Sequence, residues 1–333
     1  MGSRRIVIAS RIATAWDLDP SVIVGCVVLA IVYAIACRDL TPSPFPSSPR
    51  RGRHTLSTIW RGTKGTADNS VGKGNQKRKR GLPPSSGSPS LKGRGRGLGL
   101  FMLGDLLMLL ALISPLDVLA DEYLFSAHML QHMLLVLAVP PLLILGIPRQ
   151  LAMSIVRVHS LNRIERALRS PVVAWTLGMA ALWIWHLPRL YDATLASEAL
   201  HIFEHLIFLV TATIFWWPIL APLEDSRMSH GAAFAYLGAA MLSTTILGIL
   251  ITFAPVGVYT AYLHPHDSLR ILEALRQSWG LTTEADQELG GLLMWVPGGL
   301  VYLCAIMAVL ARWYRTPQPE HFSHNRVGVS HGA

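Results

Sequence analysis

The sequence is short of both charge and cysteine. Asp, Glu, Lys and Arg make up 15% of its 333 residues, whereas an ordinary soluble domain carries about 25%. The three cysteines, Cys26, Cys37 and Cys304, are far apart and form no CxxC or CxC pair. This spacing excludes a zinc knuckle, a thiolate copper site and a disulfide framework. The sequence also has no hydrolytic triad, nucleotide-binding loop or catalytic carboxylate pair, so we predict that the chain is not an enzyme.

Apolar sequence is abundant instead. Apolar residues make up 51% of the chain and gather in runs close to the about 20 residues that cross a hydrocarbon core. Because backbone polar groups in lipid must be satisfied within their own segment, these runs are predicted to be helices. The predicted fold class is all-α, a polytopic integral membrane bundle of about seven transmembrane helices. The predicted spans are residues 21–37, 98–113, 126–145, 172–185, 200–220, 231–253 and 289–311.

Basic residues are unevenly divided between the two sides of these spans. Of the 29 Lys and Arg, 23 fall on one side, 14 of them within residues 38–97. The positive-inside rule makes that side cytoplasmic. We therefore expect a multi-pass protein of the bacterial cytoplasmic (inner) membrane, with its N-terminus outside and its C-terminus in the cytoplasm. The basic residues lie between apolar runs and not on an amphipathic face, so no nucleic-acid partner is expected.

The chain divides into four predicted parts. Residues 1–37 hold an N-terminal segment and the first transmembrane helix, residues 98–311 form a six-helix membrane core, and residues 312–333 form a cytoplasmic tail. Residues 38–97, rich in Pro, Gly, Ser and basic residues, are predicted to be a disordered cytoplasmic loop. That loop either binds the anionic head groups of membrane lipid or is a solvated linker that enforces the topology.

Histidines carry the candidate chemistry. His128 and His132 are spaced i, i+4, and His201 and His205 repeat this spacing, which puts each pair on one helix face about 6 Å apart along the axis. His186 ends the fourth predicted span. The predicted topology brings all five to the outer membrane face. Imidazole binds copper, zinc, iron and nickel, so we predict a metal site, with the alternative that these are interfacial histidines bonded to carbonyl groups.

Further residues near the histidines could assist such a site. Thioethers favour Cu(I), and carboxylates often orient metal-bound imidazoles. Met129 and Met133 each follow a histidine, so their side chains are rotated about 100° from the histidine face. The possible accessory residues are Met129, Met133, Asp117, Glu204, Asp286 and Met294.

Four stretches of the sequence form a recognisable set when they are taken in order. They are Ser114-Pro115-Leu116-Asp117 with the run to His132-Met133; Trp185-His186-Leu187-Pro188 with Tyr191-Asp192; His201 to His205 with Phe215-Trp216-Trp217-Pro218; and Asp286-Gln287 to Gly290-Gly291 with Met294-Trp295. As a set they resemble the cytochrome c oxidase assembly factor family CtaG, which is associated with caa(3)-type oxidases. The resemblance covers about residues 98–311. The resemblance implies a multi-span membrane protein that helps deliver copper to, or mature, the terminal oxidase.

Together these features predict a membrane factor of the respiratory chain that acts in cytochrome c oxidase assembly. We expect oxidase subunits as its partners and copper as the metal that the outer-face histidines hold and deliver. Two alternatives stay open. One is a haem-binding membrane cytochrome or haem carrier, since histidines on facing helices can ligate haem iron. The other is an assembly scaffold that binds no metal.

Overall fold

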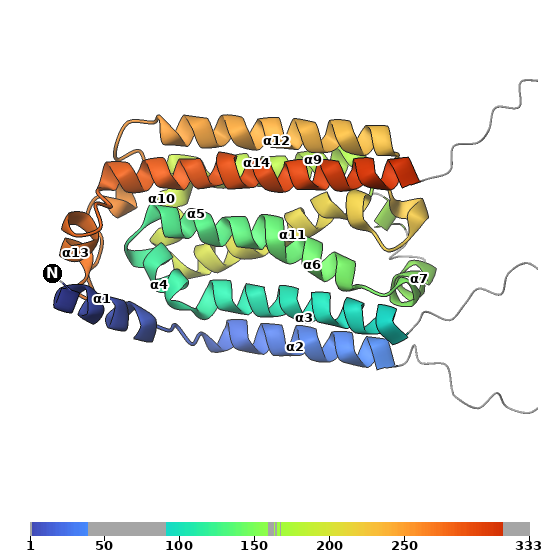
Figure 1. Cartoon of the computed structure of the whole chain (residues 1–333), viewed down its shortest axis with the longest axis horizontal. Helices are drawn as coiled ribbons and strands as arrows, with labels where there is room; N and C mark the ends of the chain where they lie inside the picture. Colours follow the sequence, from blue (N-terminus) through green and yellow to red (C-terminus); the bar gives the residue numbers. More distant parts are fainter. Residues whose placement is uncertain (1, 39–90, 159–162, 164, 167, 316–333) are drawn as a thin grey trace, which may run out of the picture.

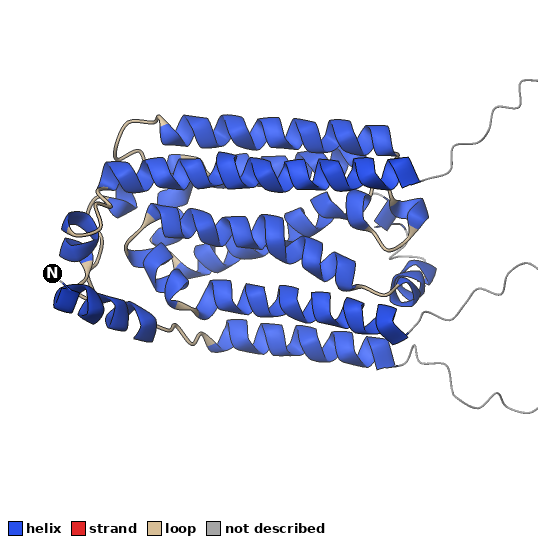
Figure 2. Cartoon of the chain, viewed as in Figure 1, coloured by secondary structure: helices blue, strands red, loops and turns tan. Residues whose placement is uncertain are grey.

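The computed structural model describes residues 2–38, 91–158, 163, 165–166 and 168–315. Every regular element in these ranges is helical (Figures 1 and 2). Within them, six helical segments are long and apolar enough to cross a membrane, which confirms the all-α, polytopic fold class. They are α2 (Pro20–Arg38), α3 (Leu91–Ile113), the continuous helix Phe125–Gly146, α11 (Glu198–Leu220), α12 (His230–Thr252) and α14 (Thr283–Arg315).

The fourth predicted span corresponds to a shorter apolar helix, α9 (Pro171–Trp185). It is 15 residues long, below the about 20 that a full span needs. The other predicted spans each fall on one of the six longer segments. α3 begins at Leu91, seven residues before the predicted start of its span. Residues 39–90 of the predicted loop and residues 316–333 of the predicted tail lie outside the described residues.

Short helices close the two ends of the bundle. At one end, here called the α4 end, lie α1 (Gly2–Thr14), α4 (Pro115–Glu122), α10 (Pro188–Leu195), η3 (Thr260–Tyr262) and α13 (Leu272–Gln277). At the other, the α7 end, lie α7 (Arg149–Arg157) and η2 (Glu224–Ser226) (Figure 1). Helices α5 (Phe125–Met133) and α11 both begin at the α4 end, so residues in their first turns lie at a similar depth.

The helix that starts with α5 passes through a π-helical segment, η1 (Leu134–Ala138), before continuing as α6 (Val139–Gly146). Pro140 and Pro141 follow directly and lack N–H groups, so neither an α- nor a π-type bond can reach the carbonyl of Val136. The indole N–H of Trp216 on α11 donates to that carbonyl at 3.0 Å. The span therefore continues through the two prolines because a neighbouring helix supplies the missing donor.

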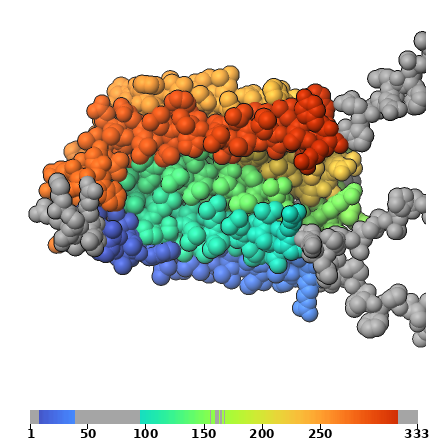
Figure 3. All heavy atoms as spheres, in the orientation of Figure 1, coloured from blue at the N-terminus to red at the C-terminus, as the bar shows by residue number. Residues whose placement is uncertain are grey.

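Glycines on α14 allow unusually close packing. In the space-filling view α14 runs beside α12 along the length of the bundle (Figure 3). A Cβ placed on Gly291 would lie 2.6 Å from the backbone nitrogen of Thr252, closer than two such atoms can approach. Residues on the outer surface of the spans are apolar, as shown by the exposed Leu242, Leu250 and Leu300. This is the surface expected of helices that face lipid.

α2 packs against the rest of the bundle through Tyr33. Its ring stacks on Phe101 of α3 with a centroid separation of 3.7 Å, and its hydroxyl donates to the carbonyl of Gly146 at 2.8 Å. These contacts fix the first span beside α3 and the end of α6.

Candidate metal centre

The i, i+4 pair on α5 is buried inside the bundle. His128 is 0% exposed and His132 is 4% exposed, and their ring centroids are 4.2 Å apart in an edge-to-face arrangement. Their position follows from the helix itself, because residues four apart lie on one face. That face points toward α11.

The second pair approaches the first from α11. His201 and His205 have ring centroids 4.2 Å apart. His201 lies 5.2 Å from His128, and His205 lies 5.5 Å from His132. His186, at the C-terminus of α9, lies 5.9 Å from His132. The structure thus brings the five histidines singled out from the sequence into one cluster, which we call the histidine cluster.

Two groups within this cluster have the spacing of metal ligands. One is His128, His132 and His205, whose potential ligand atoms all lie within 4.8 Å of one another. The other is Asp121, His128 and His201, by the same measure. Metal–nitrogen bonds to imidazole are about 2.0–2.1 Å, so modest side-chain rotations would bring either set around a single ion. Both sets share His128.

Most imidazole nitrogens of the cluster have no hydrogen-bond partner among the described residues, although they are buried. Such a buried polar atom costs about 1–3 kcal/mol, and native proteins contain few of them. Here they share one place in the bundle. They are both ring nitrogens of His128 and His132, and Nε2 of His186, His201 and His205.

His186 is oriented by its own helix. Its Nδ1 lies 2.7 Å from the carbonyl oxygen of Leu182, one turn earlier. Because a carbonyl can only accept, Nδ1 carries the proton and donates it, which leaves a lone pair on Nε2. A histidine whose other nitrogen donates to a carbonyl is the usual arrangement for metal ligation through Nε2.

Glu204 lies beside His132 in the cluster. It is 0% exposed, and its Oε1 is 3.8 Å from His132 Nε2. Neither carboxylate oxygen has a hydrogen-bond partner among the described residues. A buried carboxylate is stable only when it is paired or neutralised, so this position favours a cation beside it.

Two other predicted accessory carboxylates contact the backbone and an amide and not the imidazoles. Asp286 accepts from the backbone N–H groups of Phe125 and Ser126 at 2.8 and 3.1 Å, which caps the first turn of α5. Asp117 accepts from Gln131 Nε2 at 2.6 Å, and burial raises the pKa of Asp117 to about 7. Both contacts fix the helix that carries His128 and His132.

Asp121 was not among the candidate residues drawn from the sequence. It lies on α4, and its Oδ2 is 3.6 Å from His201 Nδ1. A usable signal exists, because Asp117 and Asp121 repeat the i, i+4 spacing of the histidines. Tyr191, which is fully buried and whose ring centroid is 5.1 Å from His128, carries no comparable signal.

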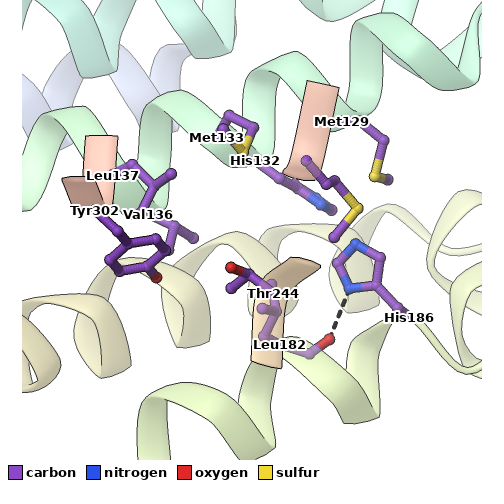
Figure 4. A pocket seen from close by; sticks show the side chains of 10 residues that line it. Met129, His132, Met133, Val136, Leu137, Leu182, His186, Thr244 and Tyr302 are labelled. Atoms are coloured by element: carbon purple, nitrogen blue, oxygen red, sulfur yellow. Dashed lines mark hydrogen bonds between the residues drawn. The ribbon is translucent and has the colours of Figure 1, made fainter. Parts of the chain in front are cut away.

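The three candidate methionines, Met129, Met133 and Met294, lie on the other side of His132. Together with His132 and His186 they line a cavity of about 30 Å³ between α5, α9, α12 and α14 (Figure 4). Figure 4 shows the hydrogen bond that links the His186 ring to the Leu182 carbonyl at its edge. The cavity adjoins the histidine cluster through His132.

A larger cavity of about 450 Å³ reaches the histidine cluster from its other side, where it is lined by His201 and His205. We call it the acidic vestibule, because five carboxylates line it: Asp17, Asp19, Asp117, Asp121 and Glu198. Burial raises the pKa of Asp121 to about 8, as it raises that of Asp117, so the negative charge of the vestibule grows as the pH rises through 7 and 8. Negative charge in a cleft concentrates cations there. The vestibule is therefore suited to admitting cations to the histidine cluster.

Comparison with known families identifies this architecture. Residues 92–316 match the family described as cytochrome c oxidase caa3 assembly factor (Caa3_CtaG). The chain belongs to this family. The caa3 assembly factor match contains all five histidines, whereas α1 and α2, which bring Asp17 and Asp19 to the vestibule, lie outside it.

Curated relatives are more distant. An uncharacterized protein of Mycobacterium bovis is 28% identical over 211 residues, which cover 58% of this chain and 30% of that protein. An uncharacterized protein of Mycobacterium leprae is 25% identical over 210 residues, with the same coverage. The matched part of the chain thus spans about a third of the length of these relatives. No solved structure matches the chain.

Proposed function

We propose that this caa3 assembly factor binds copper at the histidine cluster and passes it to cytochrome c oxidase during assembly. The observation that carries the proposal is the gathering of three buried imidazoles, two half-buried imidazoles and Glu204 in one place. Most of their nitrogen and carboxylate atoms have no hydrogen-bond partner among the described residues. A cation would satisfy them together. Copper suits an imidazole set, and it is the cargo that an oxidase containing copper requires.

The donor set also suits transfer. The ligand set consists of imidazoles and one carboxylate and contains no thiolate. Copper bound here is therefore released more readily than copper bound in a closed cysteine site. The acidic vestibule, lined by His201 and His205, would be the route between the cluster and the surrounding water. The carrier would be non-catalytic, and its partner would be an oxidase subunit that receives the metal.

The proposed placement is the bacterial cytoplasmic membrane with the α4 end outside. The basic residues counted between the spans support this orientation. The histidine cluster and the vestibule would then face the outer side, where the copper would be collected. Residues 38–97 would lie in the cytoplasm.

Metal analysis of the purified full-length protein tests the proposal. We expect bound copper in the wild-type protein, and a 10- to 100-fold weaker affinity after His128→Ala, His132→Ala or His205→Ala, the usual scale for a lost ligand. His264→Ala and His266→Ala are matched controls, because these histidines are exposed at the same end of the bundle. Each of the three ligand variants, but neither control, should also lower oxidase activity in cells while its own abundance stays constant.

Other results would contradict the proposal in distinct ways. A Soret absorption band with stoichiometric haem would establish the haem carrier. A metal-free protein that restores oxidase assembly, with all histidine variants active, would establish the scaffold.

A further inference from the structure

The methionine-lined cavity has a chemistry that the histidine cluster lacks. We propose that it is a second copper position, selective for Cu(I), with the thioethers of Met129, Met133 and Met294 and Nε2 of His186 as ligands. His132 would be shared with the histidine cluster. The inference rests on the proposed function in one respect, that copper is the cargo.

Four of the five proposed ligand residues are buried inside the bundle, and Met133 is half-buried. Met129 is 0% exposed and Met294 is 5% exposed, and His132 and His186 are each 4% exposed. Thioether sulfur is a soft ligand that favours Cu(I), whereas harder divalent ions prefer oxygen or nitrogen. A site with three thioethers therefore discriminates by oxidation state, which imidazoles alone do not.

Helix α14 leaves space for these methionines on α5. A Cβ on Gly290 would clash with Phe125 Cδ1 and lie 3.2 Å from Met129 Cγ, and a Cβ on Gly298 would lie 3.2 Å from Met133 Cε. A larger residue at Gly290 would press on the Phe125 ring and on Met129, and one at Gly298 would press on Met133. Glycine at these two positions thus keeps the Met129 and Met133 side chains between α5 and α14.

The nitrogen ligand is already prepared. His186 Nδ1 donates a hydrogen bond to the Leu182 carbonyl, and its buried Nε2 has no hydrogen-bond partner in the part of the chain that the structure describes. This unpartnered atom distinguishes the cavity from an ordinary methionine-filled gap, in which every lining group is apolar. The cavity volume of about 30 Å³ exceeds the roughly 10–15 Å³ that one water molecule needs on the same measure, so a bare copper ion fits.

A buried carboxylate lies close enough to compensate the positive charge of a bound Cu(I) ion. Thioethers and neutral imidazoles leave a bound Cu(I) with its full positive charge, which is costly in a membrane interior. The nearest buried carboxylate is Glu204, 3.8 Å from His132 Nε2. Since His132 borders both the cavity and the cluster, an ion can move between the two positions without leaving the neighbourhood of that carboxylate.

X-ray absorption of the full-length protein loaded anaerobically with Cu(I) tests the inference. We expect sulfur scatterers in the copper shell, together with nitrogen. Replacing all three methionines by leucine, which conserves volume, should abolish the sulfur signal and lower the Cu(I) stoichiometry by one equivalent in a chelator-competition titration. Met179→Leu is the matched control, because Met179 is 5% exposed on α9 and does not line the cavity.

The outcomes separate this inference from the proposed function. Copper bound with nitrogen and oxygen scatterers alone in the wild-type protein overturns the methionine position and leaves the histidine cluster as the carrier site. A wild-type protein that binds no copper overturns both. The pair His128→Ala and His205→Ala should keep the sulfur signal while losing the other equivalent. If the triple methionine variant fails to fold, the wild-type spectrum and the single variant Met294→Leu still decide the matter.

Discussion

The carboxylate of Asp286, on α14, accepts a hydrogen bond of 2.6 Å from the hydroxyl of Ser126, in the first turn of α5. Together with two backbone N–H bonds, this contact supplies α5 with a cap that its own sequence lacks, since Leu124 at the N-cap position has no side-chain acceptor. His128 and His132 follow within two turns. Helix α14 therefore fixes the position of the histidines on the third span.

Replacing Asp286 should weaken the metal site without removing a ligand. Hydrogen bonds to a charged group contribute about 1.5–3 kcal/mol each, so Asp286→Ala is expected to destabilise the protein by a few kcal/mol and lower copper affinity. Thermal unfolding in detergent and a copper titration measure the two effects. Glu284→Gln, on an exposed side chain two residues earlier, should change neither. Full affinity in Asp286→Ala would show that α5 is fixed by other contacts.

Two glycines on α14 should respond in opposite ways to alanine. Gly291→Ala would place a Cβ 2.6 Å from the backbone nitrogen of Thr252 and force α12 and α14 apart, at about 1–3 kcal/mol. A Cβ on Gly299 has nothing within 4 Å, so Gly299→Ala should be neutral or stabilising by up to about 1 kcal/mol. Unfolding midpoints of the two variants give the comparison. Equal midpoints would contradict the tight α12–α14 contact.

Loss of the Trp216 indole should destabilise the bundle through the carbonyl of Val136. In Trp216→Phe that carbonyl has no donor, which costs about 1–3 kcal/mol in addition to the lost packing. Trp313→Phe is the control, because Trp313 is 46% exposed. If the two variants unfold at the same temperature, the Trp216 bond does not support the π-helical segment.

The acidic vestibule predicts a kinetic effect. In the double variant Asp17→Asn with Asp19→Asn, copper uptake at low ionic strength should slow by about 3- to 10-fold, because fewer charges attract the cation. The difference should vanish near 1 M salt, where the screening length is about 3 Å. Stopped-flow mixing with copper measures it. Asp225→Asn, at the α7 end, serves as control, and an unchanged rate in the vestibule variant would mean that copper enters elsewhere.

Much of the architecture could be predicted from the local spacing of residues in the sequence. The apolar runs located the spans, and the i, i+4 pairs placed His128 with His132 and His201 with His205. The direction of each predicted span then placed the two pairs at the same depth in the bundle, and the structure confirms that they lie side by side. Their service as metal ligands stays a prediction, since geometry alone does not establish binding.

Contacts between distant residues were beyond the reach of spacing. Asp286 is 160 residues from Ser126, and its acidic side chain near a predicted metal site suggested an imidazole partner, whereas it caps a helix. Asp121 was missed as a neighbour of His201 because its spacing from Asp117 indicates a shared helix face and not which residues pack against that face. The methionine cavity could not be predicted from spacing either, because it depends on glycines of α14 that face α5.

The bond between Trp216 and the Val136 carbonyl also has a consequence for evolution. The indole is needed only while Pro140 and Pro141 withhold their N–H groups, and the prolines are tolerated only while the indole is present. Selection therefore acts on the three positions as a unit, and each step through an intermediate carries a penalty. Homologues should keep all three residues or replace them together, so that the prolines and this tryptophan covary across the family although they lie on different helices.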